Sequence, residues 1–170
     1  MSGRAIFLAV GTQLPFDRLT KALDGWCGAT GRGSEVFGQV GHLDETHVTP
    51  AHFEWQARIG PEDYTQRMQN ADVIVSHAGM GTIITALTLG KPIIIMARRA
   101  HLGEQRNDHQ YATLKRFKDR AGVFAVETEG ELAAVLEQLL QEGQKGSQTQ
   151  ASAFAEERLT NALKDFIHNR

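Results

Sequence analysis

The sequence predicts an α/β fold: a single Rossmann-like domain in which helices cover both faces of a doubly wound parallel sheet. Short apolar runs alternate along the chain with segments of helical periodicity, which is the pattern of successive βαβ units. Glycine-containing turns follow two of these runs, at the end of the sheet where such folds bind ligands. The 170 residues, 41% of them hydrophobic, can bury one core of this kind but leave no room for a second.

The first half of the chain is expected to supply three strands and two helices. Residues 5–10 are an apolar run that predicts the first strand, and a turn at 11–12 ends it. A helix follows, marked by apolar residues at helical spacing: Phe16, Leu19, Leu23 and Trp26. Residues 35–40 and 53–58 predict two more strands, joined by a polar loop. Pro61, followed by two acidic residues, predicts the first turn of the second helix.

The second half repeats the alternation of strand and helix. Residues 73–75 predict a buried strand, and a helix follows directly, with apolar residues at helical spacing: Met80, Ile83, Ile84 and Leu87. The Gly-Lys-Pro triplet at 90–92 ends that helix, and residues 93–96 predict the next strand. A polar loop at 98–108 leads into a further helix, and residues 123–126 predict the last strand.

Composition at the end of the chain divides it into three parts. Residues 1–142, which finish with an amphipathic helix, form the Rossmann-like domain. Residues 143–153 are rich in Gln, Gly and Ser and predict a flexible connection. Residues 154–170 carry one apolar stripe and predict a tethered C-terminal helix. This helix is a candidate docking element for a partner, although packing on its own domain explains the stripe equally well.

Charge and cysteine usage exclude several classes of protein. Lys plus Arg number 18 against 20 Asp plus Glu, so no basic footprint indicates a nucleic-acid partner. The single cysteine, Cys27, cannot form an internal disulfide, which favours a reducing cytoplasm. No apolar stretch approaches the roughly 20 residues that span a bilayer, and the N-terminus lacks the pattern of a signal peptide. We therefore expect any membrane location to depend on another protein.

The turn after the 73–75 strand has the features of a phosphate-binding site. Gly79 and Gly81 allow close approach to the backbone, and the helix that follows presents unpaired N–H groups and a partial positive charge. Thr82 is placed to cap this helix or to donate its hydroxyl to a phosphate. Gly11 and Thr12 offer a second loop across the same crevice. A tight turn that binds no ligand is the alternative.

His77, at the end of the same strand, is more specific evidence for a phosphate site than the glycines, because its ring can donate a hydrogen bond to a phosphate. A structural histidine is the alternative.

No Gly-Lys-Ser/Thr triplet is present, which excludes a P-loop. The turn nearly matches the dinucleotide fingerprint, and Arg98 and Arg99 follow the next strand, where an arginine can accept an NADP 2′-phosphate. An NADP-binding oxidoreductase is therefore a competing hypothesis.

Three segments together resemble a known family: Ser-His-Ala-Gly-Met-Gly-Thr-Ile at 76–83, Leu-Gly-Lys-Pro at 89–92 and Asn-Asp-His-Gln at 107–110. They are similar to the C-terminal domain of MurG-like glycosyltransferases, the half of a GT-B enzyme that binds the UDP-sugar. The likeness covers residues 5–140. It is strongest to stand-alone versions of that domain, the small catalytic subunit of the two-part N-glycan N-acetylglucosaminyltransferase and PssE-type subunits of exopolysaccharide glucuronosyltransferases. Residues 98–110 look particularly PssE-like.

The resemblance implies a role for each matching position. The diphosphate would be held by Gly11, Thr12, Gly79, Met80, Gly81 and Thr82. Uracil and ribose would meet Gly60, Pro61, Thr85 and Glu104. MurG-type enzymes carry a ribose-binding glutamate where this chain has Thr85, so Glu104 is the candidate substitute. The donor sugar would meet Arg98, Arg99, Asp108, His109 and Gln110, with one of the two arginines pairing with a glucuronate carboxylate; a solvated charged loop is the alternative. His77 and His109 are the expected catalytic residues.

The function implied by the resemblance is that of a donor-binding catalytic subunit in a two-component, inverting UDP-sugar glycosyltransferase. It would transfer glucuronic acid or N-acetylglucosamine to a lipid-linked acceptor in polysaccharide biosynthesis. A membrane-anchored partner would bind the acceptor and recruit this cytoplasmic chain to the inner face of the membrane. In isolation the chain could self-associate through the surface meant for that partner.

No cofactor and no obligatory metal are expected, since four loop residues considered as ligands fit no common metal pattern: His101, Glu104, Asp108 and His109. The alternatives are the NADP-binding oxidoreductase and a non-catalytic nucleotide-sugar-binding interaction module.

Overall fold

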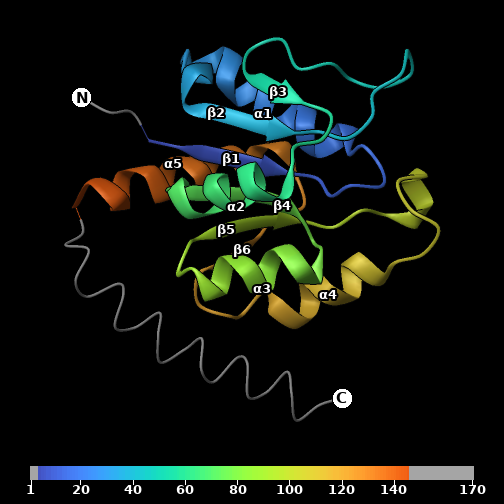
Figure 1. The fold of residues 1–170 in the computed structure, drawn as a ribbon. Helices are drawn as coiled ribbons and strands as arrows, with labels where there is room; N and C mark the ends of the chain where they lie inside the picture. Colours follow the sequence, from blue (N-terminus) through green and yellow to red (C-terminus); the bar gives the residue numbers. More distant parts are fainter. Residues whose placement is uncertain (1–3, 146–170) are drawn as a thin grey trace.

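Six parallel strands form a single sheet at the centre of the computed structural model, which describes residues 4–145 (Figure 1). The strands are β1 (Ile6–Ala9), β2 (Val36–Gln39), β3 (Glu54–Gln56), β4 (Val73–His77), β5 (Ile93–Met96) and β6 (Val123–Ala125). Their order across the sheet is β3-β2-β1-β4-β5-β6. This is the doubly wound Rossmann order, which reverses direction between β1 and β4. The predicted fold class is confirmed.

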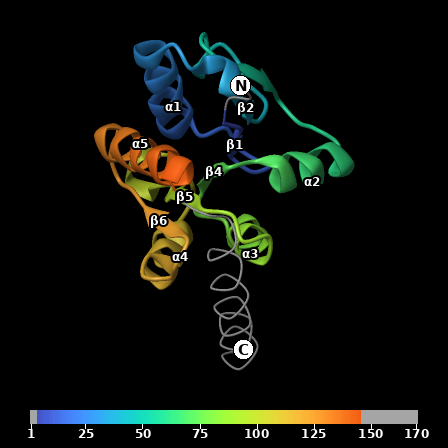
Figure 2. The same ribbon diagram turned by 90° about the vertical axis from the view of Figure 1, so that its left-hand side faces the viewer.

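Within residues 4–145, four α-helices and two short 3₁₀ turns lie between the strands, and a fifth α-helix follows the last strand. They are α1 (Asp17–Thr30), η1 (Gly33–Glu35), α2 (Pro61–Asn70), α3 (Met80–Thr88), η2 (Ala100–Leu102), α4 (His109–Phe117) and α5 (Glu129–Lys145). Figure 2 shows α1 and α5 on one side of the sheet and α2 and α3 on the other. The side chains of α4 pack into the same core as those of α3. Both faces of the sheet are therefore covered.

The alternation of side chains along β1 explains why two cores form. Ile6 and Leu8 point into the core beneath α1 and α5, whereas Phe7 and Ala9 point into the core beneath α2, α3 and α4. The central strands are apolar on both faces, and the whole of β5 is buried. A strand buried on two sides must read as a continuous apolar run, which is why the sequence located β5 so closely.

The connection from β2 to β3 is a loop without a helix, as the sequence predicted. Carboxylate side chains of α1 fix this loop by accepting hydrogen bonds from its backbone amides. Asp17 accepts a hydrogen bond from the Val48 amide, and Asp24 accepts from the amides of Ala51 and His52. Side chains of one helix therefore satisfy three backbone amides of the loop.

The last described helix runs past residue 142, the predicted end of the Rossmann-like domain. Helix α5 continues to Lys145, so the predicted connection at 143–153 begins within its last turn. The rest of that connection and the predicted helix at 154–170 lie outside the described residues. Within residues 4–145, none of the helices has the length and apolar character needed to cross a membrane.

Candidate active site

An open cleft of about 980 Å³ lies at the carboxyl ends of the central strands. This is the end of the sheet at which doubly wound folds bind ligands, next to the point where the strand order reverses. Eleven residues that the sequence analysis singled out line it: Gly11, Thr12, Gly60, Pro61, His77, Gly79, Gly81, Thr82, Thr85, Arg98 and Gln110. Loops that are distant in sequence therefore converge on one site.

The start of α3 forms one wall of this cleft. Gly79 is the N-cap of the helix and has no side chain with which to cap the N–H groups of the first turn. A Cβ on Gly81 would meet nothing within 4 Å, so the backbone there is open to a ligand. Thr82 lines the cleft, and its hydroxyl lies 3.4 Å from that of Tyr64. No side chain of the described residues therefore caps the N–H groups of this turn, which is what the predicted anion-binding role requires; that role stays a prediction.

His77 lies between the two loops that the sequence assigned to a diphosphate. Its Nδ1 is 3.2 Å from the carbonyl oxygen of Ala9. Because that oxygen can only accept, Nδ1 carries the proton and Nε2 presents a lone pair. The ring packs against Gly11 and Gly79, and a Cβ at either position would crowd it. The two glycines thus make room for the imidazole as well as for any ligand.

The environment of His77 keeps it neutral. Burial lowers the pKa of its imidazole to about 4, and the positive charge of Arg98 acts in the same direction, while the hydrogen bond to Ala9 opposes both. A neutral ring with a bare Nε2 accepts a hydrogen bond rather than donating one. A phosphate oxygen can accept a hydrogen bond from Nε2 only if Nε2 is protonated, so binding there requires that a proton be taken up with the ligand.

A buried glutamine shapes the opposite wall. Gln39, at the end of β2, is 2% exposed, and its Oε1 accepts a hydrogen bond of 3.0 Å from the Ile59 amide. This bond fixes the backbone at Ile59, directly before Gly60, the N-cap of α2, and Pro61 in the first turn of that helix. Backbone at Gly60 and Pro61 lines the cleft where the sequence analysis expected the uracil edge.

Arg98 lies at the end of β5 and is 5% exposed. Its Nη2 donates to the carbonyl oxygens of Val10, at 2.6 Å, and of Leu14. The backbone amide of Arg98 donates to Oε1 of Gln110, so these two predicted sugar-binding residues are also bound to each other.

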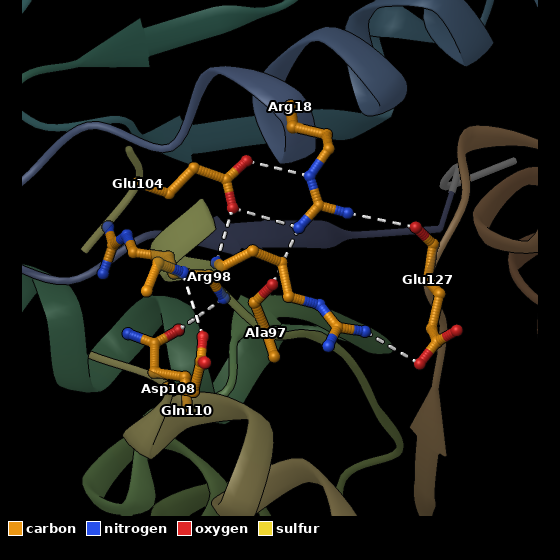
Figure 3. A network of polar contacts seen from close by, with 9 residues as sticks. Arg18, Ala97, Arg98, Glu104, Asp108, Gln110 and Glu127 are labelled. Atoms are coloured by element: carbon orange, nitrogen blue, oxygen red, sulfur yellow. Dashed lines mark hydrogen bonds and ion pairs between the residues drawn. The ribbon is translucent and has the colours of Figure 1, made fainter. Parts of the chain in front are cut away.

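Five predicted site residues do not line the cleft: Met80, Arg99, Glu104, Asp108 and His109. The carboxylate of Glu104 accepts hydrogen bonds of 2.9 and 3.1 Å from the guanidinium of Arg18 in α1, and another from the Arg99 amide (Figure 3). The guanidinium of Arg99 pairs with Glu127 at 2.9 Å and covers the ring of Tyr111. Glu104 and Arg99 are therefore engaged by other groups of the protein, and the expected ribose contact of Glu104 and sugar contact of Arg99 stay predictions.

The other three residues face elsewhere for simple reasons. Asp108 accepts a hydrogen bond of 3.0 Å from the Ala100 amide and so closes the η2 loop. His109 is exposed at the first position of α4. The side chain of Met80 packs against the core beneath α2, α3 and α4.

Several lining residues were missed by sequence reasoning: Gln13, Gln39, Arg58, Ile59, Tyr64, Thr65 and Gln105. Gln39 and Arg58 lie at the carboxyl ends of the strands predicted at 35–40 and 53–58, so these positions could have indicated them. Gln13 lies in a loop and belongs to no motif, so nothing in the sequence marks it, whereas Gln105 belongs to the PssE-like segment at 98–110 and could have been chosen there.

The cleft is suited to an anion. Its lining includes Arg58 and Arg98 but no aspartate or glutamate, although the chain has 20 acidic residues. Across residues 4–145, no group of three or more His, Cys, Asp or Glu side chains is arranged to hold a metal ion. A helix N-terminus, two arginines and the lack of a carboxylate in the lining are features that favour phosphate groups.

Comparison with known proteins agrees with this geometry. The model of the glycosyltransferase family 28 C-terminal domain matches residues 5–167. A search of curated proteins found no match.

Solved glycosyltransferases share the fold. MurG of Acinetobacter baumannii is 21% identical, with a TM-score of 0.60 over 100% of this chain and 51% of its own. The glycosyltransferase of kitacinnamycin is 20% identical, with a TM-score of 0.62 over 94% of this chain and 38% of its own. The chain therefore spans about half of the length of MurG and less than half of the other protein.

A third similar structure is nearer in size. The solution structure of ALG13 is 18% identical, with a TM-score of 0.54 over 79% of this chain and 84% of its own. At these identities the solved structures show the fold alone, a Rossmann-like domain of the kind found at the C-terminal end of GT-B glycosyltransferases.

Proposed function

The chain belongs to the glycosyltransferase family 28 C-terminal domains, and on this premise we propose that it is the donor-binding catalytic subunit of a two-component, inverting UDP-sugar glycosyltransferase. The observation that carries the proposal is the carboxylate-free cleft, in which the N-terminus of α3 faces Arg98 and the loop at 11–13. Such a site favours a diphosphate, and the wall at Gly60 and Pro61 leaves space for a base beside it.

The proposed chemistry is a displacement at the anomeric carbon of the donor sugar. The acceptor oxygen forms the new bond as the bond from carbon to the β-phosphate oxygen breaks, and the electron pair of that bond passes to UDP. Donors that face the growing negative charge lower the barrier. The first turn of α3 supplies such donors, so we propose that no metal is obligatory. The absence of carboxylates from the lining, which would otherwise ligate Mg²⁺, supports this.

The acceptor proton must go to a base, and we propose that a partner subunit provides it. His77 is the only histidine in the lining, and burial lowers the pKa of its imidazole to about 4, so its free Nε2 is a weak base. In the proposed assembly the partner is membrane-anchored, delivers a lipid-linked acceptor for polysaccharide biosynthesis and recruits this chain to the cytoplasmic face. The active site of a GT-B enzyme lies between two domains, and residues 5–167 match the C-terminal one.

Exposed apolar side chains support a docking surface beside the cleft. Two large hydrophobic residues of the described chain are exposed, Leu14 at 46% and Leu102 at 53%. They lie in the loops that follow β1 and β5, which leave the sheet at the same end (Figure 1). A partner that covers the mouth of the cleft would bury both.

We propose glucuronic acid or N-acetylglucosamine as the transferred sugar. The PssE-like segment at 98–110 supports glucuronic acid, and of its two adjacent arginines Arg98 lines the cleft whereas Arg99 pairs with Glu127. Gln105 and Gln110 from the same segment also line the cleft and offer amide groups to sugar hydroxyls.

The test is calorimetric titration of the full chain with UDP, UDP-glucuronate, UDP-N-acetylglucosamine and NADPH, followed by a transfer assay with candidate membrane partners. We expect UDP and both UDP-sugars to bind, one UDP-sugar more tightly than the other, NADPH not to bind, and sugar transfer to require a partner. Binding without transfer under every partner tested would instead identify a non-catalytic interaction module. Binding of NADPH in place of UDP would overturn the proposal.

A further inference from the structure

Arg98 is a buried cation that has no anionic partner among residues 4–145. Its side chain forms no ion pair, and its Nη2 is bound to two neutral carbonyl oxygens, those of Val10 and Leu14. Its Nε is buried and has no hydrogen-bond partner. Removing a charge from water is costly unless an opposite charge or a full set of hydrogen bonds replaces the water. The protein alone does not provide either.

The acid that most affects Arg98 is already engaged. Glu104 favours the charged form of Arg98 electrostatically, but its carboxylate oxygens are bound to Arg18 and to the Arg99 amide (Figure 3). Burial lowers the pKa of Arg98 to about 10, which still leaves the guanidinium charged at neutral pH. His77 beside it is neutral, so the positive charge at this end of the cleft is not balanced.

The hydrogen bonds of Arg98 lie on either side of the loop at residues 11–13, which lines the cleft together with the start of α3. Val10 and Leu14 stand immediately before and after residues 11–13, and the guanidinium joins their carbonyl oxygens. All three loop residues line the cleft, across from Gly79, Gly81 and Thr82. Arg98 therefore both fixes the shape of this loop and places a positive charge behind it.

We propose that Arg98 supplies the counter-charge for the diphosphate of the donor and holds the 11–13 loop against it. The inference rests on the proposed function and adds to it a positioning and charge-stabilising residue. When the bond to the sugar breaks, its electron pair stays on the β-phosphate oxygen, and the guanidinium offsets the added negative charge. The alternative is that Arg98 recognises the carboxylate of a glucuronate donor.

The experiment compares the affinities of uridine, UMP, UDP, UDP-N-acetylglucosamine, UDP-glucuronate and inorganic pyrophosphate for four proteins. These are the wild type, Arg98→Gln, Arg98→Lys and the control Arg106→Gln, which removes one exposed charge from the same loop outside the cleft lining. We expect Arg98→Gln to weaken UDP and both UDP-sugars alike, by roughly tenfold to a hundredfold, and to leave uridine nearly unchanged. Arg98→Lys should recover part of the loss, and Arg106→Gln should match the wild type.

Other outcomes overturn the inference. A loss confined to UDP-glucuronate would assign Arg98 to the sugar carboxylate. Equal losses for uridine and UDP, with no recovery in Arg98→Lys, would leave it a purely structural role.

Failure of the proposed function is separable from failure of this inference. If the wild type binds no uridine compound, the proposed function fails, and pyrophosphate decides about Arg98: binding that depends on Arg98 supports the counter-charge, and binding that does not overturns it.

A measurement on the wild type covers the case in which Arg98→Gln does not fold. The Nε–H signal of Arg98 in a ¹⁵N NMR spectrum should move on addition of UDP and stay in place on addition of uridine. An unmoved signal at saturating UDP would contradict the proposal.

Discussion

The Nε2 atom of His77 would lie 2.2 Å from a Cβ built on Gly79, so the imidazole and a side chain at position 79 cannot both keep their places. The φ of Gly79 is −92°, which any residue can adopt, so the backbone itself does not require glycine. The histidine requires it. We therefore expect Gly79→Ala to displace the ring from Ala9 and to lower the free energy of unfolding by about 2 kcal/mol. Denaturant unfolding measures this, and a stability equal to wild type would contradict it.

Substitution of Gly81 separates two effects of a glycine at this turn: its cost to the stability of α3 and the access that it gives a phosphate to the backbone. Its Cβ would enter open space on the cleft side, so Gly81→Ala should keep the fold and stabilise α3 by roughly 0.5–1 kcal/mol. The same methyl group should obstruct a phosphate and weaken UDP binding by about tenfold. Gly25→Ala in α1 is the matched control, because its Cβ also meets nothing and it lies outside the cleft lining. We expect that variant to gain stability with unchanged UDP affinity.

The pH dependence of stability should carry the signature of His77. Its pKa is lowered to about 4 in the folded chain from 6.5, so the unfolded chain binds more protons between these values. The contribution is fully present above pH 6.5 and is lost as the pH falls toward 4. We expect the wild type to lose about 3 kcal/mol more than His77→Gln over this interval. Parallel stability curves for the two proteins would show that the imidazole is not held neutral.

Binding of a phosphate ligand should raise the pKa of His77, which is lowered in the free protein. A phosphate oxygen close to Nε2 favours the charged ring, so UDP should be taken up together with a proton at about pH 7. Titration calorimetry in buffers of different ionisation enthalpy counts those protons. His77→Gln is the control, because it subtracts the protons that UDP itself takes up. Equal proton uptake by the two proteins would place the phosphates away from Nε2.

The pair formed by Arg18 and Glu104 should be a stabilising contact and not merely a surface ion pair. Its side chains are 24% and 15% exposed, and two hydrogen bonds join them. We expect a double-mutant cycle with Arg18→Met and Glu104→Gln to give a coupling of about 1–2 kcal/mol. The more exposed pair of Asp63 and Arg67 is the control and should give less than about 0.5 kcal/mol. Equal couplings in the two cycles would refute the distinction.

Local patterns in the sequence were sufficient for the fold. The apolar runs at 73–75 and 93–96 mark strands buried on both faces, and the glycines at 79 and 81 mark the turn that faces the cleft. These features are set by neighbours a few positions away, so periodicity and turn chemistry can find them. Eleven predicted residues therefore converge on one cleft.

The loop at 98–108 shows where such reasoning fails. Its conformation depends on Arg18, which lies 86 residues from Glu104 in the chain and belongs to another helix. No local pattern indicates that contact, so Glu104 and Arg99 were expected at a ligand and are instead bound to the protein. The burial of Arg98 beneath the loop after β1 depends on tertiary structure in the same way.

The central claim, that the first turn of α3 and the 11–13 loop hold a uridine diphosphate, is tested most directly by following backbone amide signals of the full ¹⁵N-labelled chain during a UDP titration. The account predicts saturable shifts that are largest at residues 11–13 and 79–82, with smaller shifts at Gly60 and Ile59. No shift at saturating UDP, or shifts centred away from the carboxyl ends of the strands, would contradict it.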